Sequence, residues 1–229
     1  MHTQIKIHFC FILVLIGFLI LVIDSGSKCQ DLDYPDSLIQ KLDENNLVIG
    51  NLRLNSQTRE ILVPGHINMN SDLIEYFAVT AYGKTHEAVV VLDIQPMHLQ
   101  LGLLLLGLEY GQNLGFQGDT VMPLGDSVYI YLGWLDENQD TTIYEISELI
   151  VDYQNNQPMP STAWIFTGSF LHDGHYMADM DGSIIATYSD PVAILNNPLS
   201  GRMDDTVYGA NERLLPPAGT PVFMKIITR

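Results

Sequence analysis

The sequence predicts a β-rich α+β domain in which a mixed sheet packs around one central apolar helix at about residues 97–108. Three observations support this fold class. Many short runs of β-branched and aromatic residues are separated by turn residues, as strands are. Residues 87–94 form a continuous valine-rich run, which is typical of a strand buried on both faces. Residues 97–108 follow Pro96, which fits the first turn of a helix, and are almost wholly apolar, which favours a buried helix.

The first 27 residues have the features of a secretory signal peptide or an N-terminal membrane anchor. Lys6 precedes an unbroken apolar run from Phe9 to Ile23, and Ser25 and Ser27 supply small residues where a signal peptidase would cut. The run is shorter than the roughly 20 residues of a typical membrane span. We therefore expect export to the periplasm or the cell exterior, with cleavage after Ser27 or retention as an anchor both left open.

Charge and cysteine content exclude several kinds of partner and cofactor. The chain has a net charge of −17, and residues 1–27 hold only Lys6 and Asp24, so the remainder keeps that charge. Negative charge repels nucleic acid and anionic lipid, so we expect no nucleic-acid partner and membrane contact only through the N-terminal segment. The two cysteines are Cys10 and Cys29, of which Cys10 lies in the apolar run. No iron–sulfur cluster is therefore expected, and the sequence identifies no other cofactor.

Residues 28–36 are polar and are expected to be a linker, and residues 28–44 together are expected to be the linker and the entry to one domain at residues 45–229. Three strands are predicted at the start of this domain: Asn46–Leu54, Arg59–Met69 and Leu73–Tyr82. Pro64-Gly65 interrupts the second, which places it at a bulge or at a sheet edge. The valine-rich strand follows, and Pro96 then fits the first turn of the apolar helix.

The second half of the chain is predicted to be mainly strands. Residues 127–135 and 141–145 form a hairpin around the turn at 136–140, and a short helix is expected over Ile146–Tyr153. Asp181-Gly182 is a hairpin signal. A helical turn is expected at Pro191–Leu195, and the remaining strands are Ala163–Gly168, Tyr176–Asp179, Ser183–Tyr188 and Pro221–Ile227.

Several short motifs occur in a distinctive order. They are Thr85-His86-Glu87 before the buried strand, Pro96 and His98 at the helix start with Gly107 and Gly111 after it, Trp134, Trp164-Ile165-Phe166-Thr167-Gly168-Ser169, Tyr176-Met177-Ala178-Asp179, and Gly219-Thr220-Pro221-Val222. Together the chain resembles the YdjY-type domain family of exported bacterial proteins, especially those of planctomycete type, over roughly residues 45–229. The resemblance implies no particular reaction, since none is assigned to the family.

His86, Glu87 and His98 are the strongest candidates for chemistry. Adjacent residues on a strand point to opposite faces, so His86 and Glu87 could not share a metal ion without a bulge. One of them could act as a base or ligand beside His98, whose pKa a helix N-terminus lowers. The alternative is a buried histidine and carboxylate that satisfy backbone groups where strand and helix meet.

Other side chains complete the candidate pocket or form weaker sites. Trp164, Ser169, Tyr176 and Asp179 could join the pocket, although a tryptophan on a strand is more often core and a serine after Gly168 more often part of a turn. His172 and His175 are weak metal candidates, because the surrounding Asp-Gly pairs favour an exposed hairpin. Asp136-x-Asn138-x-Asp140 resembles a calcium loop only in its first ligands, so a turn is the better interpretation.

Two functional hypotheses follow. The first is an exported cell-envelope protein that acts as a non-enzymatic binding or interaction module for an envelope protein or a small ligand. The second is a metal-dependent enzyme or accessory protein that uses a cluster of His86, Glu87 and His98. The two differ in whether those three side chains meet in one pocket.

Overall fold

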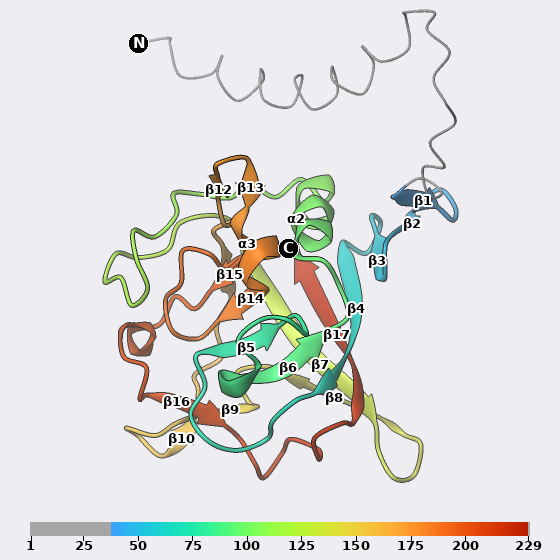
Figure 1. Cartoon of the computed structure of the whole chain (residues 1–229). Coiled ribbons are helices and arrows are strands. Elements are labelled where there is room, and N and C mark those ends of the chain that lie inside the picture. Colours follow the sequence, from blue (N-terminus) through green and yellow to red (C-terminus); the bar gives the residue numbers. More distant parts are fainter. Residues whose placement is uncertain (1–37, 229) are drawn as a thin grey trace, which may run out of the picture. The chain divides into compact units, whose positions relative to one another are not determined.

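The computed structural model describes residues 38–228, and Figure 1 shows their course. The predicted N-terminal segment 1–27, residues 28–37 of the predicted linker, and Cys10 and Cys29 lie outside the described residues. None of the helices in the described part of the chain has the length and apolar character needed to cross a bilayer.

A closed ring of strands forms the centre of the described domain. Within residues 38–228, eight strands follow one another around it, and β6 pairs with β4 to close it. Two neighbouring pairs, β14–β15 and β5–β6, are parallel and the others are antiparallel, which confirms the predicted β-rich mixed sheet. The strands in ring order are β4 (Glu60–Ile67), β17 (Pro221–Thr228), β7 (Ser127–Leu135), β11 (Trp164–Phe166), β15 (Leu195–Asn196), β14 (Ser183–Ala186), β5 (Tyr76–Val79) and β6 (Ala88–Leu92).

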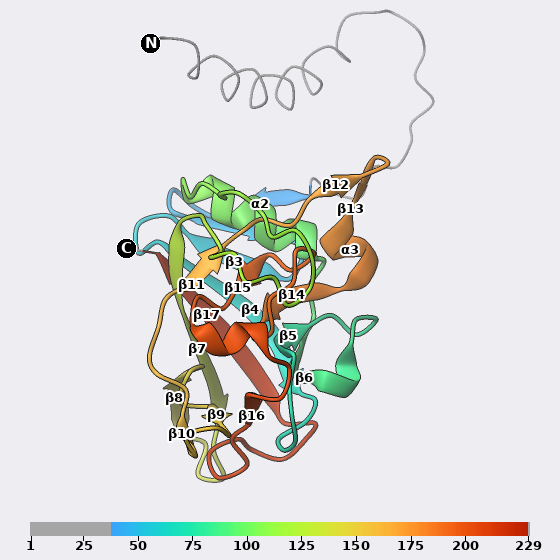
Figure 2. The ribbon, with the colours of Figure 1, turned by 90° about the vertical axis from the view of Figure 1, so that its left-hand side faces the viewer.

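Shorter elements surround the ring. Three strands continue the sheet outward from β4, namely β3 (Leu52–Asn55), β2 (Asn46–Ile49) and β1 (Ile39–Lys41), and β8 (Thr141–Glu145) pairs with β7. Two small sheets are β10 (Gln157–Pro158), β9 (Ile150–Asp152) and β16 (Tyr208–Ala210), and the hairpin of β12 (Leu171–His172) with β13 (His175–Tyr176). The helices are α2 (Pro96–Leu105) and α3 (Met177–Asp181), with 3-10 turns η1 (Thr85–Glu87) and η2 (Ser200–Met203). Figures 1 and 2 place α2, α3 and β12–β13 at one end of the ring and β9, β10 and β16 at the other.

Strand β4 closes the ring by changing partner along one edge. Its first half, Glu60–Leu62, pairs with β3 and its second half, Gly65–Ile67, pairs with β6. Pro64 lies between them, and its carbonyl accepts a hydrogen bond from Asp93 N–H at 2.9 Å. In a strand, the N–H and the C=O of one residue point to the same neighbouring strand. The nitrogen of Pro64, which carries no hydrogen, therefore lies on the edge where β4 passes from β3 to β6, and not on the edge that pairs with β17. The interruption predicted at Pro64-Gly65 is thus a junction between two partner strands.

The core follows the strand periodicity. In β17, Val222, Met224 and Ile226 point inward while their neighbours are more exposed. Strand β6 is buried along its whole length, as its continuous apolar run predicts, because it is covered on both faces. The two fully buried aromatic side chains of β11, Trp164 and Phe166, belong to the same core.

The apolar helix is not central, which corrects that part of the predicted fold. Helix α2 begins at Pro96, as predicted, but ends at Leu105, and Leu106 is already its C-cap. Leu99 and Leu103 are buried against the ring, whereas Leu104 and Leu105 are exposed. The helix therefore covers one end of the ring, and one side of the helix itself faces solvent. An apolar residue at almost every position gives no indication of which side faces solvent.

Four local predictions were wrong. The single strand expected over Asn46–Leu54 is two strands, β2 and β3, which pair across a turn at residues 50–51. The short helix expected over 146–153 is a turn followed by β9. One partner of β9, the strand β16, lies far along the chain, and the other, β10, has only two residues and a weak sequence signal. The strand expected over 176–179 is mostly α3, and Gly182 ends that helix in the left-handed conformation (φ 76°) instead of forming a hairpin. The helical turn expected at 191–195 is a set of turns that leads into β15.

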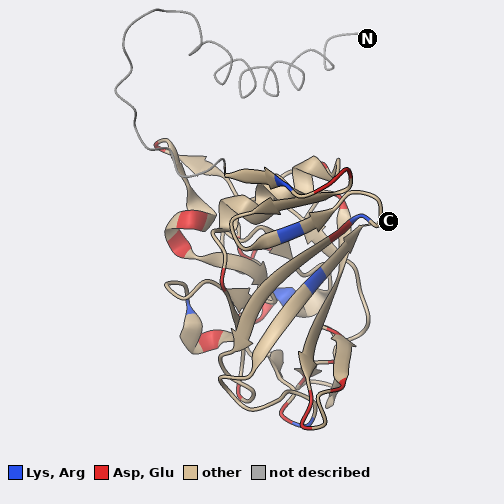
Figure 3. Cartoon of the chain, turned by 90° about the vertical axis from the view of Figure 1, so that its right-hand side faces the viewer, with Lys and Arg blue, Asp and Glu red and all other residues tan. Residues whose placement is uncertain are grey.

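Acidic groups are in large excess over basic ones. The chain has 27 Asp and Glu against 10 Lys and Arg, so most carboxylates have no cationic partner. Figure 3 shows the few Lys and Arg both on strands and in loops, while most Asp and Glu occur in loops and short helical turns. Lys225 of β17 reaches Glu60 of β4 at 2.6 Å, and this contact lowers the pKa of the Glu60 carboxyl.

A buried polar chain connects β5 with the segment that precedes β15. Tyr76 donates its hydroxyl to Asp190 Oδ2 at 2.6 Å and accepts a hydrogen bond from Lys84 Nζ at 2.7 Å. Val192 N–H donates to the other Asp190 oxygen at 2.8 Å. Burial and the negative charge of Asp190 raise the pKa of Tyr76, so its hydroxyl stays protonated and available to donate. The buried Asp190 carboxylate is thereby connected to the cation of Lys84.

Replacing Tyr76 with Phe should therefore destabilise the fold. The substitution removes a hydroxyl that serves a buried charge, and we expect the free energy of unfolding in urea to fall by about 1.5–3 kcal/mol. Tyr110→Phe, which removes a hydroxyl from an exposed side chain, is the matched control and should change it by less than about 0.5 kcal/mol. Equal losses in both variants would contradict a special role for the Tyr76 hydroxyl.

Candidate functional site

His86 and Glu87 lie in the 3-10 turn η1, not at the start of a strand. The turn brings the two side chains to the same side, with His86 Nε2 and Glu87 Oε2 3.5 Å apart. The prediction that they point to opposite faces is therefore wrong. The His86 side chain is 78% exposed, so the alternative of a buried histidine that satisfies backbone groups does not hold either.

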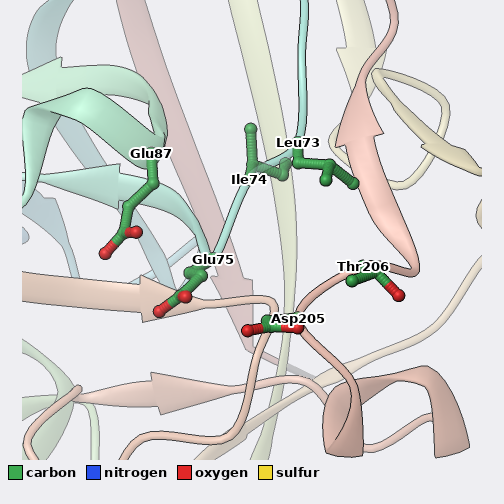
Figure 4. A pocket seen from close by; sticks show the side chains of 6 residues that line it. All are labelled: Leu73, Ile74, Glu75, Glu87, Asp205 and Thr206. Atoms are coloured by element: carbon green, nitrogen blue, oxygen red, sulfur yellow. The ribbon is translucent and has the colours of Figure 1, made fainter.

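Glu87 contributes to an acidic hollow of about 220 Å³. Figure 4 shows Glu75 between Glu87 and Asp205, with Leu73 and Ile74 beside them. Burial raises the pKa of the Glu75 carboxyl, and the negative charge of Glu87 raises it further. The hollow disfavours anions. Within residues 38–228, however, no three His, Cys, Asp or Glu side chains are grouped so that they could hold a metal ion.

His98 lies in the first turn of α2 and packs on the β2–β3 hairpin. A Cβ built on Gly50 would lie 2.5 Å from His98 Nδ1, so the imidazole rests directly on the Gly50 backbone. Its Nδ1 is buried and has no hydrogen-bond partner among the described residues. Burial lowers the pKa of His98, while the nearby carboxylate of Asp179 raises it by a smaller amount. His98 is thus a packed, neutral side chain at ordinary pH.

Asp179 and Tyr176 hold the start of α2. Gln95, the residue that precedes the helix, makes no capping bond through its side chain. Asp179 Oδ1 accepts the Met97 N–H at 2.8 Å instead, so a residue of α3 caps α2. The buried Tyr176 hydroxyl lies 3.1 Å from Gln100 Oε1 and 3.2 Å from the Gly168 carbonyl oxygen, to which it can donate. Both candidate residues therefore have structural roles in this cluster.

Ser169 and Trp164 are both buried. Ser169 has a left-handed backbone conformation (φ 53°), and its hydroxyl makes no hydrogen bond in the described part of the chain. Within residues 38–228, no histidine or carboxylate is hydrogen-bonded to this hydroxyl as an activating base would be. Trp164 is fully buried within the main core, as the structural interpretation of a strand tryptophan predicts.

The two weaker sites are turns. His172 and His175 face one another across the β12–β13 hairpin, and both are exposed. His172 Nε2 lies 3.6 Å from a carboxylate oxygen of Asp173, but no third ligand joins them within residues 38–228. Asp136 Oδ1 accepts the N–H groups of Asn138 and Asp140, which is the arrangement of a tight turn.

The predicted pocket is divided between two places. His98, Tyr176 and Asp179 gather around α2, whereas His86 and Glu87 lie in η1 beside β6, well away from α2 in Figure 1. A single cluster of His86, Glu87 and His98 is therefore not formed.

The loop between α2 and β7 contains the motif residues Gly107 and Gly111, but the motifs did not indicate its length or its exposed apolar side chains. It spans residues 106–126, which is 21 residues from the end of α2 at 105 to the start of β7 at 127, and has no helix or ladder strand. Loops of this length without regular structure usually serve a function. Its only sequence signal is a mixture of glycine with apolar residues (LGLEYGQNLGFQGDTVMPLGD).

Removing the remote cap should weaken the fold. We expect Asp179→Ala to lower the free energy of unfolding by about 1 kcal/mol, the usual value of a helix N-cap. Asp93→Ala is the control, because Asp93 is an exposed carboxylate close to the same helix start. A loss in Asp179→Ala no greater than in Asp93→Ala would contradict the capping role.

The lowered pKa of His98 predicts an acid-sensitive contribution to stability. Below about pH 6.5 the unfolded chain binds a proton at this histidine more readily than the folded chain, so stability falls as the pH decreases. We expect the loss in free energy of unfolding between about pH 7.5 and 5.5 to be smaller in His98→Gln than in the unsubstituted chain. His172→Gln, at an exposed histidine, should leave the loss unchanged. Identical pH profiles for His98→Gln and the unsubstituted chain would contradict this prediction.

The comparison with protein families finds a match over most of the chain. The family model of the YdjY domain matches residues 52–227, from the first residue of β3 to Ile227 in β17. No curated protein and no solved structure matches the chain. The match covers well over half of the 229 residues and includes every strand of the closed ring. The chain therefore belongs to the YdjY domain family.

Proposed function

We propose that this chain is an exported, non-enzymatic interaction module of the cell envelope that holds a protein partner on an apolar loop region. The apolar loop region consists of loop 106–126 with the adjoining ends of α2 and β12. The exposure of its apolar side chains on a well-anchored loop is the observation that carries the proposal.

Three hydrogen bonds anchor the loop to the segment that follows β14. Asn113 Nδ2 donates to the Pro191 carbonyl oxygen at 2.7 Å. The Gly118 N–H donates to the Ser189 carbonyl oxygen at 2.7 Å. The Arg202 guanidinium donates to the Thr120 carbonyl oxygen, also at 2.7 Å. The Arg202 residue is only 3% exposed. These bonds restrain the loop, and a restrained loop loses less conformational freedom when a partner binds, which lowers the entropic cost of association.

The anchored loop nevertheless presents apolar side chains to solvent. At its base, Tyr110 packs on Gly168, which brings it next to the β12 hairpin. Clusters of exposed apolar side chains on soluble proteins commonly mark protein interaction sites. The exposed apolar side chains of the region are Leu104, Leu105, Tyr110, Phe116, Val121, Met122, Leu124, Phe170 and Leu171.

The composition of the region indicates the chemistry of the partner. Loop 106–126 contains only three acidic residues, Glu109, Asp119 and Asp126, and no basic residue. Asp119 is buried, and the N–H groups of Gly115 and Val121 donate to its carboxylate. The partner should therefore contribute apolar side chains at the contact, and the negative charge of the whole chain favours a neutral or basic protein.

Export is supported by the basic residue and apolar run at the N-terminus, and we place the module in the periplasm or the cell exterior, where residues 1–27 could also anchor it. The alternative of a metal-dependent enzyme has less support, because His86 and Glu87 lie apart from His98. A partner that is nucleic acid is disfavoured by the charge of −17.

Photo-crosslinking in living cells tests this proposal. A benzophenone amino acid placed at Phe116 or Leu171, which are 64% and 61% exposed, should form a crosslinked adduct of one defined mass. The same group at Leu135 or Ile143, exposed on the β7–β8 hairpin, is the matched control and should not form it. Adding Val121→Asp and Met122→Asp should lower the adduct yield about tenfold without unfolding the chain, because both side chains are exposed.

Several outcomes would contradict the proposal. They are the same adduct from the control positions, adducts that contain only this chain, or a yield that the two aspartates do not change. Deleting residues 1–27 in the same cells should leave the protein in the cytoplasm and abolish the adduct. A partner identified by mass should bind the purified full chain and lose affinity for the Val121→Asp, Met122→Asp variant.

A further inference from the structure

A second surface feature lies at the opposite end of the ring from α2. The small sheet of β9, β10 and β16 forms one side of a cleft of about 490 Å³. Residues 71–72, the turn at 156–158 and the segment 211–214 form its other sides. This volume falls within the range of about 300–1,000 Å³ that small-ligand sites have.

An aromatic side chain is fixed on this sheet. A Cβ built on Gly209 would lie 2.5 Å from Cε2, Cζ and Oη of Tyr153, so the phenol end of Tyr153 rests on the bare Gly209 backbone. Tyr153 is still 46% exposed and lines the cleft together with Val151 and Pro158. Contact with Gly209 thus fixes the position of the Tyr153 ring, while the rest of the ring surface is open to a ligand.

The rim around Tyr153 carries hydrogen-bonding groups of both kinds. Arg213 and Gln157 provide planar donors, and Asp72, Glu212 and Gln157 provide acceptors. Asn211 fixes this rim, because its Nδ2 donates to the Glu148 carbonyl oxygen at 2.8 Å and its Oδ1 accepts the Arg213 N–H.

This lining discriminates among classes of ligand. An anion would meet the carboxylates of Asp72 and Glu212, and a cation would meet the Arg213 guanidinium. A purely apolar ligand would separate these polar groups from water without replacing their hydrogen bonds. A neutral molecule with many hydroxyl groups and one less polar face satisfies both the rim and the aromatic ring.

We propose that this cleft binds a neutral saccharide, with Tyr153 contacting the C–H face of one sugar ring and Arg213, Asp72 and Gln157 bonding its hydroxyls. The site is separate from the apolar loop region, so it does not depend on the proposed protein partner. An exported protein that carries both surfaces would hold a protein on one and a glycan on the other.

Ligand-observed nuclear magnetic resonance and calorimetry on the purified full chain test this inference. The probes are neutral trisaccharides of glucose, mannose, galactose and N-acetylglucosamine, measured in buffer free of sugar-based detergent. We expect at least one of them to bind, and Tyr153→Ala to weaken that binding by at least about tenfold. Tyr82→Ala, at an exposed tyrosine outside the cleft, is the matched control and should bind as the unsubstituted chain does.

Two further variants extend the test, and the second of them protects it against misfolding. Gly209→Ala should displace the Tyr153 ring and weaken binding, and Arg213→Gln changes only an exposed side chain and should weaken it while leaving the melting temperature unchanged. The inference is wrong if none of the four neutral trisaccharides binds, or if Tyr153→Ala and Arg213→Gln bind normally. Tighter binding of trialanine, a galacturonic acid trisaccharide or a glucosamine trisaccharide would also overturn it, in favour of a peptide or charged ligand.

Discussion

The whole structure depends on the junction at which β4 exchanges β3 for β6. A ring closes only if its first and last strands meet, and β6 approaches β4 so closely that a Cβ on Gly65 would lie 2.5 Å from the Val91 carbonyl oxygen. Glycine permits this approach, and Pro64 lacks the N–H that would be left without a partner at the junction. Two adjacent residues thus allow one strand to belong both to the ring and to the β1–β3 extension.

The sequence predicted those parts of the fold whose signals are local. Valine at successive positions identified β6, and alternation with turn residues identified β7, β8 and β17. The sequence did not predict β9, which pairs with β16 far along the chain, or α3, a helix of five residues. The position of α2 could not be derived either, because its apolar residues surround the helix and indicate no buried side.

In the candidate site too, the sequence predicted the contacts between residues close in the chain and missed those between distant residues. The turn at Asp136 and the His172–His175 hairpin were recognisable, since their hydrogen bonds join residues four or fewer apart. The role of Asp179 was not, because it caps a helix 82 residues away. The side chains of His86 and Glu87 lie on the same side only because the two residues form a 3-10 turn. The sequence Thr-His-Glu has no preference strong enough to predict that turn. In loop 106–126 the motif residues are Gly107 and Gly111, and neither indicates a binding surface. The significance of the apolar loop region comes from anchors such as Arg202 that only the folded chain provides.

The position of β17 has a consequence for how the chain acquires its structure. Residues 221–228 lie between β4 and β7 and bond to both, so the ring has a gap until this late segment has been synthesised. During translation, β4 and β7 have no means of closing the barrel, and the nascent chain remains open. Export during synthesis, if it occurs as proposed above, would thus move a chain whose ring is still open. Insertion of a single strand between β4 and β7 is the step that completes the ring.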